Sequence, residues 1–444
     1  MARARKVRCE AEDRSDAETF FSLPRPGRRL AALTSSALAL PGIAGSASAD
    51  TPIERAKASF SSSYYLEDDL SRNKFFDDGV GSRERYEVYT FQLRFDLPVT
   101  ERVDLGVQLL YEEMSGASPW FVDAGMNGEL LQVMSGATIE EERTDLTLDL
   151  DYYLDTGKDT FSWGYSEEKD YFSTHFGIAA ERNYNEKNTT ISLSGAFSYD
   201  WIDPTDADLF TTRQSHGEKW SLDLFGGLSQ VLTRSTIGQI TINYKHSEGF
   251  LDDPYKQVAS LDPIAPRFAD VRPDMKDQFS LLLRVRQHIE PLNASMHLDY
   301  QFYRDSFEVT SHTLDLAWHQ SVMDWLTLTP SFRYYSQSKA EFYEPILNIG
   351  PVPKEHSSDF RLSPYGAVSF RLKAEVHFED LVRYDAPAWL QRLGVSEGID
   401  LTVALSYERY LSDGDYALDA VDEGDEAPGL VKFQVFTLTL GGRF

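Results

Sequence analysis

Apolar and polar residues alternate with a period of two along most of this chain, which is the pattern of a β-strand with two different faces. In the segment 279–289 the apolar set on one face is Phe279, Leu281, Leu283, Val285 and Ile289, and the opposite set is polar: Gln278, Ser280, Arg284, Arg286 and His288. The same alternation runs through 145–152 and 399–408. A helical face would need apolar residues three and four apart, so the pattern predicts an all-β fold.

Sixteen such segments can be counted after residue 56, starting near residues 57, 84, 102, 143, 160, 173, 189, 219, 236, 277, 294, 307, 325, 361, 399 and 430. Connections of three or four residues, such as Pro98–Thr100 and Asn185–Asn188, mostly alternate with longer ones such as 114–142, 249–276 and 343–360. Short turns at one end and long loops at the other are typical of an up-and-down transmembrane barrel. Without a separate strand at 160–168 the count would be fourteen.

Alternation also occurs in soluble β-sandwiches, so other features must separate the two classes. The segments are long, their polar faces carry charges at consecutive inward positions, and tyrosine and tryptophan gather near their ends, as in the aromatic belts of membrane proteins. The last segment continues to Phe444, and this terminal aromatic resembles the signal read by the outer-membrane assembly machinery. We therefore predict a transmembrane antiparallel up-and-down β-barrel of about sixteen strands in the outer membrane of a Gram-negative bacterium.

The N-terminal region predicts export from the cytoplasm. Arg25, Arg28 and Arg29 precede a short apolar run, Leu30–Gly45, and a small-x-small cleavage motif ends at Ala49, before Asp50. This is the organisation of a secretory signal peptide. We expect residues 1–49 to be a signal peptide, with the true start codon possible downstream of residue 1, and residues 50–444 to form one barrel domain.

Composition excludes several classes of function. The formal net charge of −28 argues against nucleic acid as a partner, because phosphate repels it. The only cysteine, Cys9, lies in the expected signal peptide, so disulfides, thiolate metal sites and a cysteine nucleophile are not expected. The chain has no HExxH, Walker or GxSxG motif, and we expect neither an enzyme nor a cofactor.

One catalytic arrangement stays open as the third choice. His297 and Asp299 would share the inward face of one strand, and Ser280 and His288 would lie on the next. A hydrolase built into the barrel wall would need these groups in contact.

Four stretches resemble an uncharacterised bacterial family of outer-membrane barrels that is catalogued only as a domain of unknown function. They are Ser115–Trp120, Ser135–Thr138, Tyr165–Tyr171, and Asn188–Thr190 with the following Tyr199–Asp200. The resemblance covers nearly the whole mature chain and implies an outer-membrane barrel of porin-like architecture. It implies no activity and no site residues.

The predicted inward faces supply candidate pore-lining residues. Acidic candidates lie mainly on early strands and basic candidates on later ones: Asp104, Glu112, Asp145, Asp149, Asp151 and Asp223, against Lys245, Arg284, Arg286, Arg333, Arg371 and Lys373. Opposed acidic and basic walls would set a transverse field across a pore and an ion preference. The alternative is that these charges pair into a network that closes the lumen.

We therefore predict a passive channel for small polar or charged solutes, with outer-membrane lipid, lipopolysaccharide and the barrel assembly machinery as partners, and a homo-oligomer as possible. The alternative is a closed scaffold barrel that docks a periplasmic partner through the inner connection 380–398 or the acidic loops.

The acidic run 412–429, with Asp203, Asp206, Asp208, Asp252 and Asp253, offers oxygen ligands for divalent cations, although a solvated loop is the favoured interpretation. The loop 114–142 is either a constriction loop or simple turn chemistry.

Overall fold

The computed structural model describes residues 52–77, 79, 81–135, 139–205, 207–210, 212–262, 264–379, 381, 400–422 and 424–444. The predicted signal peptide and its cleavage site at Ala49 and Asp50 lie outside these residues. Within the described parts of the chain, no helix is both long and apolar enough to cross a membrane.

Sixteen antiparallel strands close into one barrel, in the order β1-β2-β3-β6-β7-β8-β9-β10-β11-β14-β15-β16-β17-β18-β19-β20. Their bounds are β1 Lys57–Glu67, β2 Glu87–Thr100, β3 Val103–Gly116, β6 Ile139–Leu154, β7 Gly157–Glu167, β8 Tyr171–Tyr184, β9 Thr189–Ile202, β10 Gly217–Thr233, β11 Thr236–Gly249, β14 Met275–Ile289, β15 Ala294–Asp305, β16 Thr310–Met323, β17 Leu326–Gln337, β18 Tyr365–His377, β19 Asp400–Asp413 and β20 Lys432–Arg443. The predicted fold class is confirmed, and because β7 is a separate strand the count is sixteen rather than fourteen.

The barrel is closed by its first and last strands, β1 and β20, which pair from Lys57 opposite Arg443 to Glu67 opposite Phe433. The alternating segment 436–444 therefore contributes to the strand that closes the barrel. The backbone N–H of Phe444 donates to the carbonyl of Ala56, and the Phe444 side chain is exposed. Its role as an assembly signal stays a prediction.

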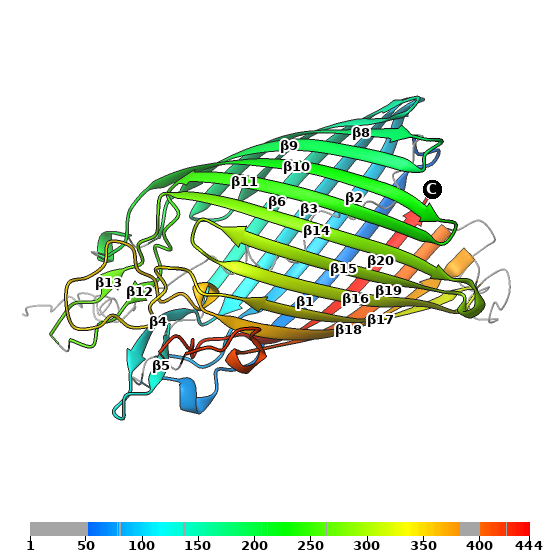
Figure 1. The fold of residues 1–444 in the computed structure, drawn as a ribbon. Helices are drawn as coiled ribbons and strands as arrows, with labels where there is room; N and C mark the ends of the chain where they lie inside the picture. The colour runs from blue at the N-terminus through cyan, green and yellow to red at the C-terminus, as the bar shows by residue number, and fades with distance from the viewer. Residues whose placement is uncertain are drawn as a thin grey trace, which may run out of the picture.

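The two ends of the barrel differ in their connections (Figure 1). At one end, here called the turn end, short turns join β2 to β3, β6 to β7 and β8 to β9, and the C-terminus lies here. At the other, the loop end, the connections 250–274 and 338–364 are long. β18 ends and β19 begins at the turn end, and the inner connection 380–398 between them, apart from residue 381, is outside the described residues.

The period-two pattern separates an apolar outer face from a polar inner face. On β2, Tyr89, Phe91 and Leu93 are 38 to 44% exposed, whereas Thr90 between them is 7% exposed. Outward aromatic rings of neighbouring strands contact one another, as Tyr64 on β1 stacks on Tyr89 with 4.7 Å between ring centroids. An exposed apolar band with aromatic rings is the surface that a lipid bilayer covers in barrels of this kind.

Smaller elements gather at the loop end. They are β4 (Pro119–Ala124) with β5 (Leu130–Met134), β12 (Gln257–Val258) with β13 (Phe268–Ala269), and the short 3₁₀ turns η1 (Arg72–Lys74), η2 (Ala207–Leu209), η4 (Phe360–Leu362) and η5 (Gly414–Tyr416); a further turn, η3 (Glu290–Leu292), lies at the turn end. Isolated bridges join the two longest loops, pairing Ser260 with Leu347 and Val271 with His356. The loop end is thus a packed structure in its own right.

Candidate functional site

The inner wall of the barrel carries all the predicted pore-lining residues, because each lies on the strand face opposite the exposed apolar side chains. These residues are Asp104, Glu112, Asp145, Asp149, Asp151, Asp223, Lys245, Arg284, Arg286, Arg333, Arg371 and Lys373. The structure therefore places them toward the lumen. That they line a conducting pore stays a prediction.

The side of the wall with the acidic candidates also carries cations. Arg94 on β2 lies 3.3 Å from Asp149, and Lys158 on β7 lies 2.9 Å from Asp151. Arg143 on β6 lies between carboxylates, 3.6 Å from Glu112. Each of these cations faces inward, in phase with the acidic residues of its own or the adjacent strand.

The side with the basic candidates likewise carries carboxylates. Asp299 on β15 pairs with both Arg284 and Arg286. Asp315, Glu408 and Glu375 pair with Arg333, Arg371 and Lys373 respectively. The acidic and basic walls are therefore less separated than the sequence analysis expected, because the candidate lists omitted these partners. The same period-two alternation predicts these partner residues when it is applied to every charged residue on an inward face.

The charges of the inner wall are partly solvated. The side chains of Arg333, Arg371 and Lys373 are 43 to 44% exposed. A small hollow opens beside them, lined by Asp315, Ser331, Phe332, Arg333, Ser369, Arg371 and Glu408. Ala196, on the inward face of β9, is exposed as well. The inner wall in the middle of the barrel is therefore charged and partly accessible to water.

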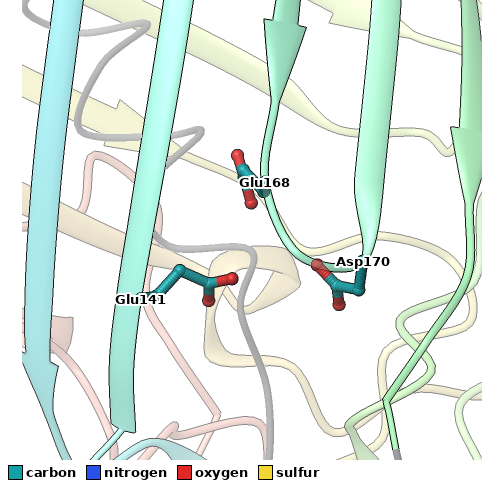
Figure 2. A group of neighbouring side chains, drawn as sticks. All are labelled: Glu141, Glu168 and Asp170. Atoms are coloured by element: carbon teal, nitrogen blue, oxygen red, sulfur yellow. The ribbon is translucent and has the colours of Figure 1, made fainter.

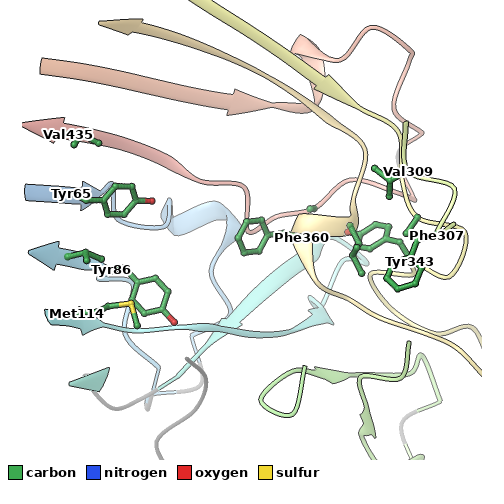
Figure 3. Packing of buried hydrophobic residues seen from close by; sticks show 12 residues of the cluster. Tyr65, Tyr86, Met114, Phe307, Val309, Tyr343, Phe360 and Val435 are labelled. Carbon is green, nitrogen blue, oxygen red and sulfur yellow. The ribbon is translucent and has the colours of Figure 1, made fainter. Parts of the chain in front are cut away.

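The loop end has a different character, because the loops 250–274 and 338–364 pack into the mouth of the barrel. We call these two segments the loop plug. Figure 3 shows Phe360 of η4 between two groups of side chains. On one side are Tyr65, Tyr86 and Met114 of the β1–β3 wall, and on the other are residues of the β15–β16 connection and of the plug itself. The buried cluster thus extends from one side of the mouth to the other.

Six charged residues of the loop plug form a buried network that we call the charge hub: Asp253, Lys256, Asp270, Arg272, Asp359 and Arg361. Arg272 contacts Asp270 at 2.7 Å and Asp359 at 2.9 Å. Arg361 contacts Asp359 and, at 2.6 Å, Asp253. Three carboxylates face three cations, so the hub is neutral as a whole. Asp359, at 0% exposure, is its centre.

Burial and charge act in opposite directions on the hub residues. Burial lowers the pKa of Lys256 to about 8, against the attraction of Asp359. Burial alone would raise the pKa of Asp359, but Arg361, Lys256 and Arg272 hold it well below its usual range. The carboxylate of Asp359 is therefore charged at neutral pH because its partners are present.

Further contacts tie the loop plug to other loops around the mouth. Lys256 Nζ donates to the carbonyl of Pro119 at 2.6 Å, and the Tyr255 hydroxyl donates to Asp170 in the β7–β8 connection. Beside the plug, the buried Arg85 contacts Glu67 at 2.6 Å, and Arg85 also stacks over the ring of Phe360. The plug is thus held from several directions.

The motif Ser115–Trp120 has a structural explanation. Gly116 has a φ of +128°, and a Cβ at this position would lie 2.3 Å from the carbonyl oxygen of Arg85. Pro119 is buried and accepts from Lys256. The motif starts the β4–β5 hairpin at the loop end. Turn chemistry therefore accounts for Gly116, and a constriction by the loop 114–142 stays a prediction.

Three carboxylates near the loop end have the spacing of a cation site. Ligand oxygens of Glu141, Glu168 and Asp170 lie within 4.8 Å of one another (Figure 2), and Arg143 lies 3.8 Å from Glu168. Such oxygen ligands would suit a hard cation. The sequence analysis did not single out this group, because its members come from β6 and from the β7–β8 connection.

Three of the acidic loop residues named from the sequence have ion-pair partners in the described part of the chain. Asp425 of the run 412–429 lies 2.8 Å from Lys339, Asp203 lies 2.7 Å from His216, and Asp253 belongs to the charge hub. These contacts agree with loops held by ion pairs.

The structure does not assemble the hydrolase arrangement. On the β14–β15 ladder, His297 is opposite Arg286, whereas Ser280 is opposite Tyr303. Six residues of strand separate the two positions, roughly 20 Å. Asp299 is bound by Arg284 and Arg286, and His297 instead packs on His319, with 4.1 Å between ring centroids.

Comparison with known proteins shows the family. The family model described as a protein of unknown function (DUF3570) matches residues 30–388. No curated protein matches the chain.

Among solved structures, the siderophore receptor PirA from Pseudomonas aeruginosa is similar at 11% identity and a TM-score of 0.39, over 81% of this chain. The chain spans only 56% of the length of PirA. A BenF-like porin from Pseudomonas fluorescens is similar at 9% identity and a TM-score of 0.41, over 88% of this chain and 98% of the porin. OccK2 from Pseudomonas aeruginosa, in complex with glucuronate, is similar at 8% identity and a TM-score of 0.39, over 89% of this chain and 99% of OccK2.

Proposed function

The chain belongs to the DUF3570 family, whose description assigns no function, and we propose from its own geometry that it is an outer-membrane channel for small polar or charged solutes. The single observation that carries this proposal is the wet, charged inner wall of a closed sixteen-stranded barrel. Barrels of sixteen to eighteen strands are wide enough to leave an aqueous channel.

The proposed orientation follows from the connections. Bacterial barrels place short turns in the periplasm and long loops outside the cell. The turn end would therefore face the periplasm, and the loop end with its plug would face the medium. The exposed apolar band of the outer face would lie in the lipid between them.

The inner wall supports passage of charged as well as neutral solutes. Cations and carboxylates line it on both sides, with side chains such as Arg333 and Lys373 partly exposed to the lumen. A solute that loses part of its hydration would meet hydrogen-bond donors and acceptors in every direction. Ion preference would then depend on which charges are paired locally and which are accessible.

The buried loop plug favours a second candidate, a closed barrel that serves as a scaffold. The charge hub and the apolar cluster around Phe360 fill the mouth with side chains that exclude water. A barrel that never opened would act through its surfaces, for example by docking a periplasmic protein at the turn end.

Solute flux into proteoliposomes separates the two candidates. The purified chain and a variant with residues 340–362 replaced by a short Gly-Ser linker would be compared in a swelling assay with sugars, amino acids and organic acids. A channel is expected to pass these solutes, faster without the plug segment. A folded barrel that excludes all of them even in the shortened variant would contradict the channel and favour the scaffold.

A further inference from the structure

The two segments of the loop plug leave the barrel at positions far apart in the sheet. The segment 250–274 connects β11 to β14, and 338–364 connects β17 to β18. Between β11 and β18 lie the four strands β14 to β17. Arg361 of one segment nevertheless contacts Asp253 of the other at 2.6 Å. Such a contact joins two loops whose strands are not neighbours in the sheet.

The opposite side of the opening is reached as well. Lys256 of the first segment donates to Pro119, which follows β3, and five strands, β6 to β10, lie between β3 and β11. Phe360 of the second segment belongs to the same buried cluster as Tyr65 on β1 and Met114 on β3. The plug thus spans the mouth in two directions.

The charge hub is the centre of this span. Asp253, Asp270 and Asp359 are at most 3% exposed, and Lys256 is 7% exposed. Charges removed from water depend on their partners for compensation, so a buried network loses stability as a whole when one member is removed. Neutralising Asp359 would leave Arg272 and Arg361 buried with one carboxylate fewer.

A wet lumen lies behind this dry layer. Ala196 and the side chains of Arg333 and Arg371 are exposed on the inner wall, whereas Ala340 and Ser357 in the plug are 0% exposed. Among the residues that the structure describes, the dry layer lies at the loop end, and the wall below it is built of regular strands. A displacement of the two loops would open the mouth without any change in the barrel.

We propose that the loop plug is an autoinhibitory gate, and that the charge hub is the latch that holds the two loops shut across the mouth. A gate has a role only if the barrel is a channel, so this proposal rests on the proposed function. The displacement of the loops can nevertheless be measured independently of solute flux. The barrel then rests closed, and the two loops leave together because they share Asp359 and its partners.

The test is the chemical accessibility of a buried plug position. Ala340→Cys, in a background with Cys9→Ser, places one thiol in the closed plug, 0% exposed in the parent chain. A charged thiol reagent is added to the refolded full chain, and the modification rate is followed by mass spectrometry. Asp359→Asn is expected to raise this rate at least tenfold, because the latch is broken while side-chain volume is kept.

Glu355→Gln is the matched control. It removes one acidic charge from the same loop, but Glu355 pairs with the exposed Lys354 outside the hub. Its modification rate is expected to stay within twofold of the parent. Heat-modifiable gel mobility establishes in each variant that the barrel itself is folded.

A second variant guards against a local effect at Asp359. Arg272→Met removes the hub cation that joins Asp270 to Asp359, from the other loop. It is expected to expose the same thiol to a similar degree, which supports a shared latch. Equal, slow modification of the parent, Asp359→Asn and Arg272→Met would overturn the gate, as would a thiol already fast in the parent. Rapid modification of the two hub variants without solute flux would support the latch proposal and contradict only the proposed channel function.

Discussion

Two sets of ion pairs lie in one barrel, and their surroundings differ more than their chemistry. On the inner wall, Arg333 and Asp315 are 2.8 Å apart, with side chains 43% and 22% exposed. In the charge hub, Arg272 and Asp359 are 2.9 Å apart, with side chains 11% and 0% exposed. Similar distances thus occur in a wet and in a dry setting.

Exposure to water separates the ion pairs that act on ion selectivity from those that act on closure of the mouth. Water screens the pairs of the wall, so they contribute little to stability but remain available to passing ions. Water does not screen the charges of the hub, so each buried charge needs the opposite charges of the other members to compensate it. Wall substitutions are therefore expected to change selectivity, and hub substitutions to change whether the mouth is closed.

The largest effect is expected from Asp359→Ala. It removes the carboxylate that Arg272 and Arg361 share, and breaking a buried pair costs about 3–5 kcal/mol. The loss should be confined to the plug, so that the barrel keeps its heat-modifiable mobility while protease cleaves within 338–364. Arg94→Ala on the inner wall is the comparison, with an expected change of at most about 1 kcal/mol. Equal protease resistance of the two variants would remove the distinction between wet and dry pairs.

The next effect is a pH dependence of the closed plug. Folding lowers the pKa of Lys256 to about 8, from about 10.4 in an unfolded chain, so the closed state releases a proton first. Stability of the closed state then rises with pH between these two values, because the open chain binds more protons there. Open probability in a bilayer should fall severalfold from pH 8 to pH 10. Lys256→Met should abolish this trend, because the charged neighbours of Lys256 (Asp359, Arg361, Asp253 and Arg85) keep their charges between pH 8 and pH 10. An unchanged trend in this variant would remove Lys256 as its source.

A smaller, purely functional effect is expected from Arg284 and Arg286. Replacing both with serine leaves Asp299 on the lumen wall without its two partner cations, so ion selectivity should shift toward cations. Reversal potentials under a salt gradient measure the shift. The plug should stay as closed as in the parent. Unchanged reversal potentials would remove these residues from the conducting path.

The smallest effect is expected at the turn end. Arg102 lies 3.1 Å from Asp155, but the two side chains are 56% and 86% exposed. Arg102→Ala should change neither protease resistance nor open probability measurably, since exposed pairs are screened. A clear effect on gating would show that exposure is a poor guide to the role of an ion pair in this barrel.

The sequence predicts the barrel well because alternation is a local signal. Predicted strand starts lie within four residues of the observed ones, and the predicted inward residues all lie on the inner face. The partners Asp299, Asp315 and Glu408 were accessible to the same reasoning, because they share that face. The acidic and basic walls are less separated than expected because only acidic residues were named on the early strands and mainly basic residues on the later ones.

The charge hub could not be predicted in this way. Asp253, Asp270 and Asp359 stand in loops without periodicity, and more than a hundred residues separate the first from the last. Their contact depends on how the sheet closes and on which loops reach across it. An acidic residue in a long loop is most simply interpreted as solvated, and for Asp359 burial by the opposite loop reverses that interpretation.

Single-channel recording of the refolded chain and of Asp359→Asn, in a planar bilayer with a salt gradient, tests the central claim most directly. We expect rare, brief openings for the parent chain and long openings for the variant, with the same unit conductance and the same reversal potential. That result would mean one charged lumen behind one removable plug. Steady conduction by both proteins would contradict a plug held shut by the hub, and silence of both folded barrels would contradict the channel.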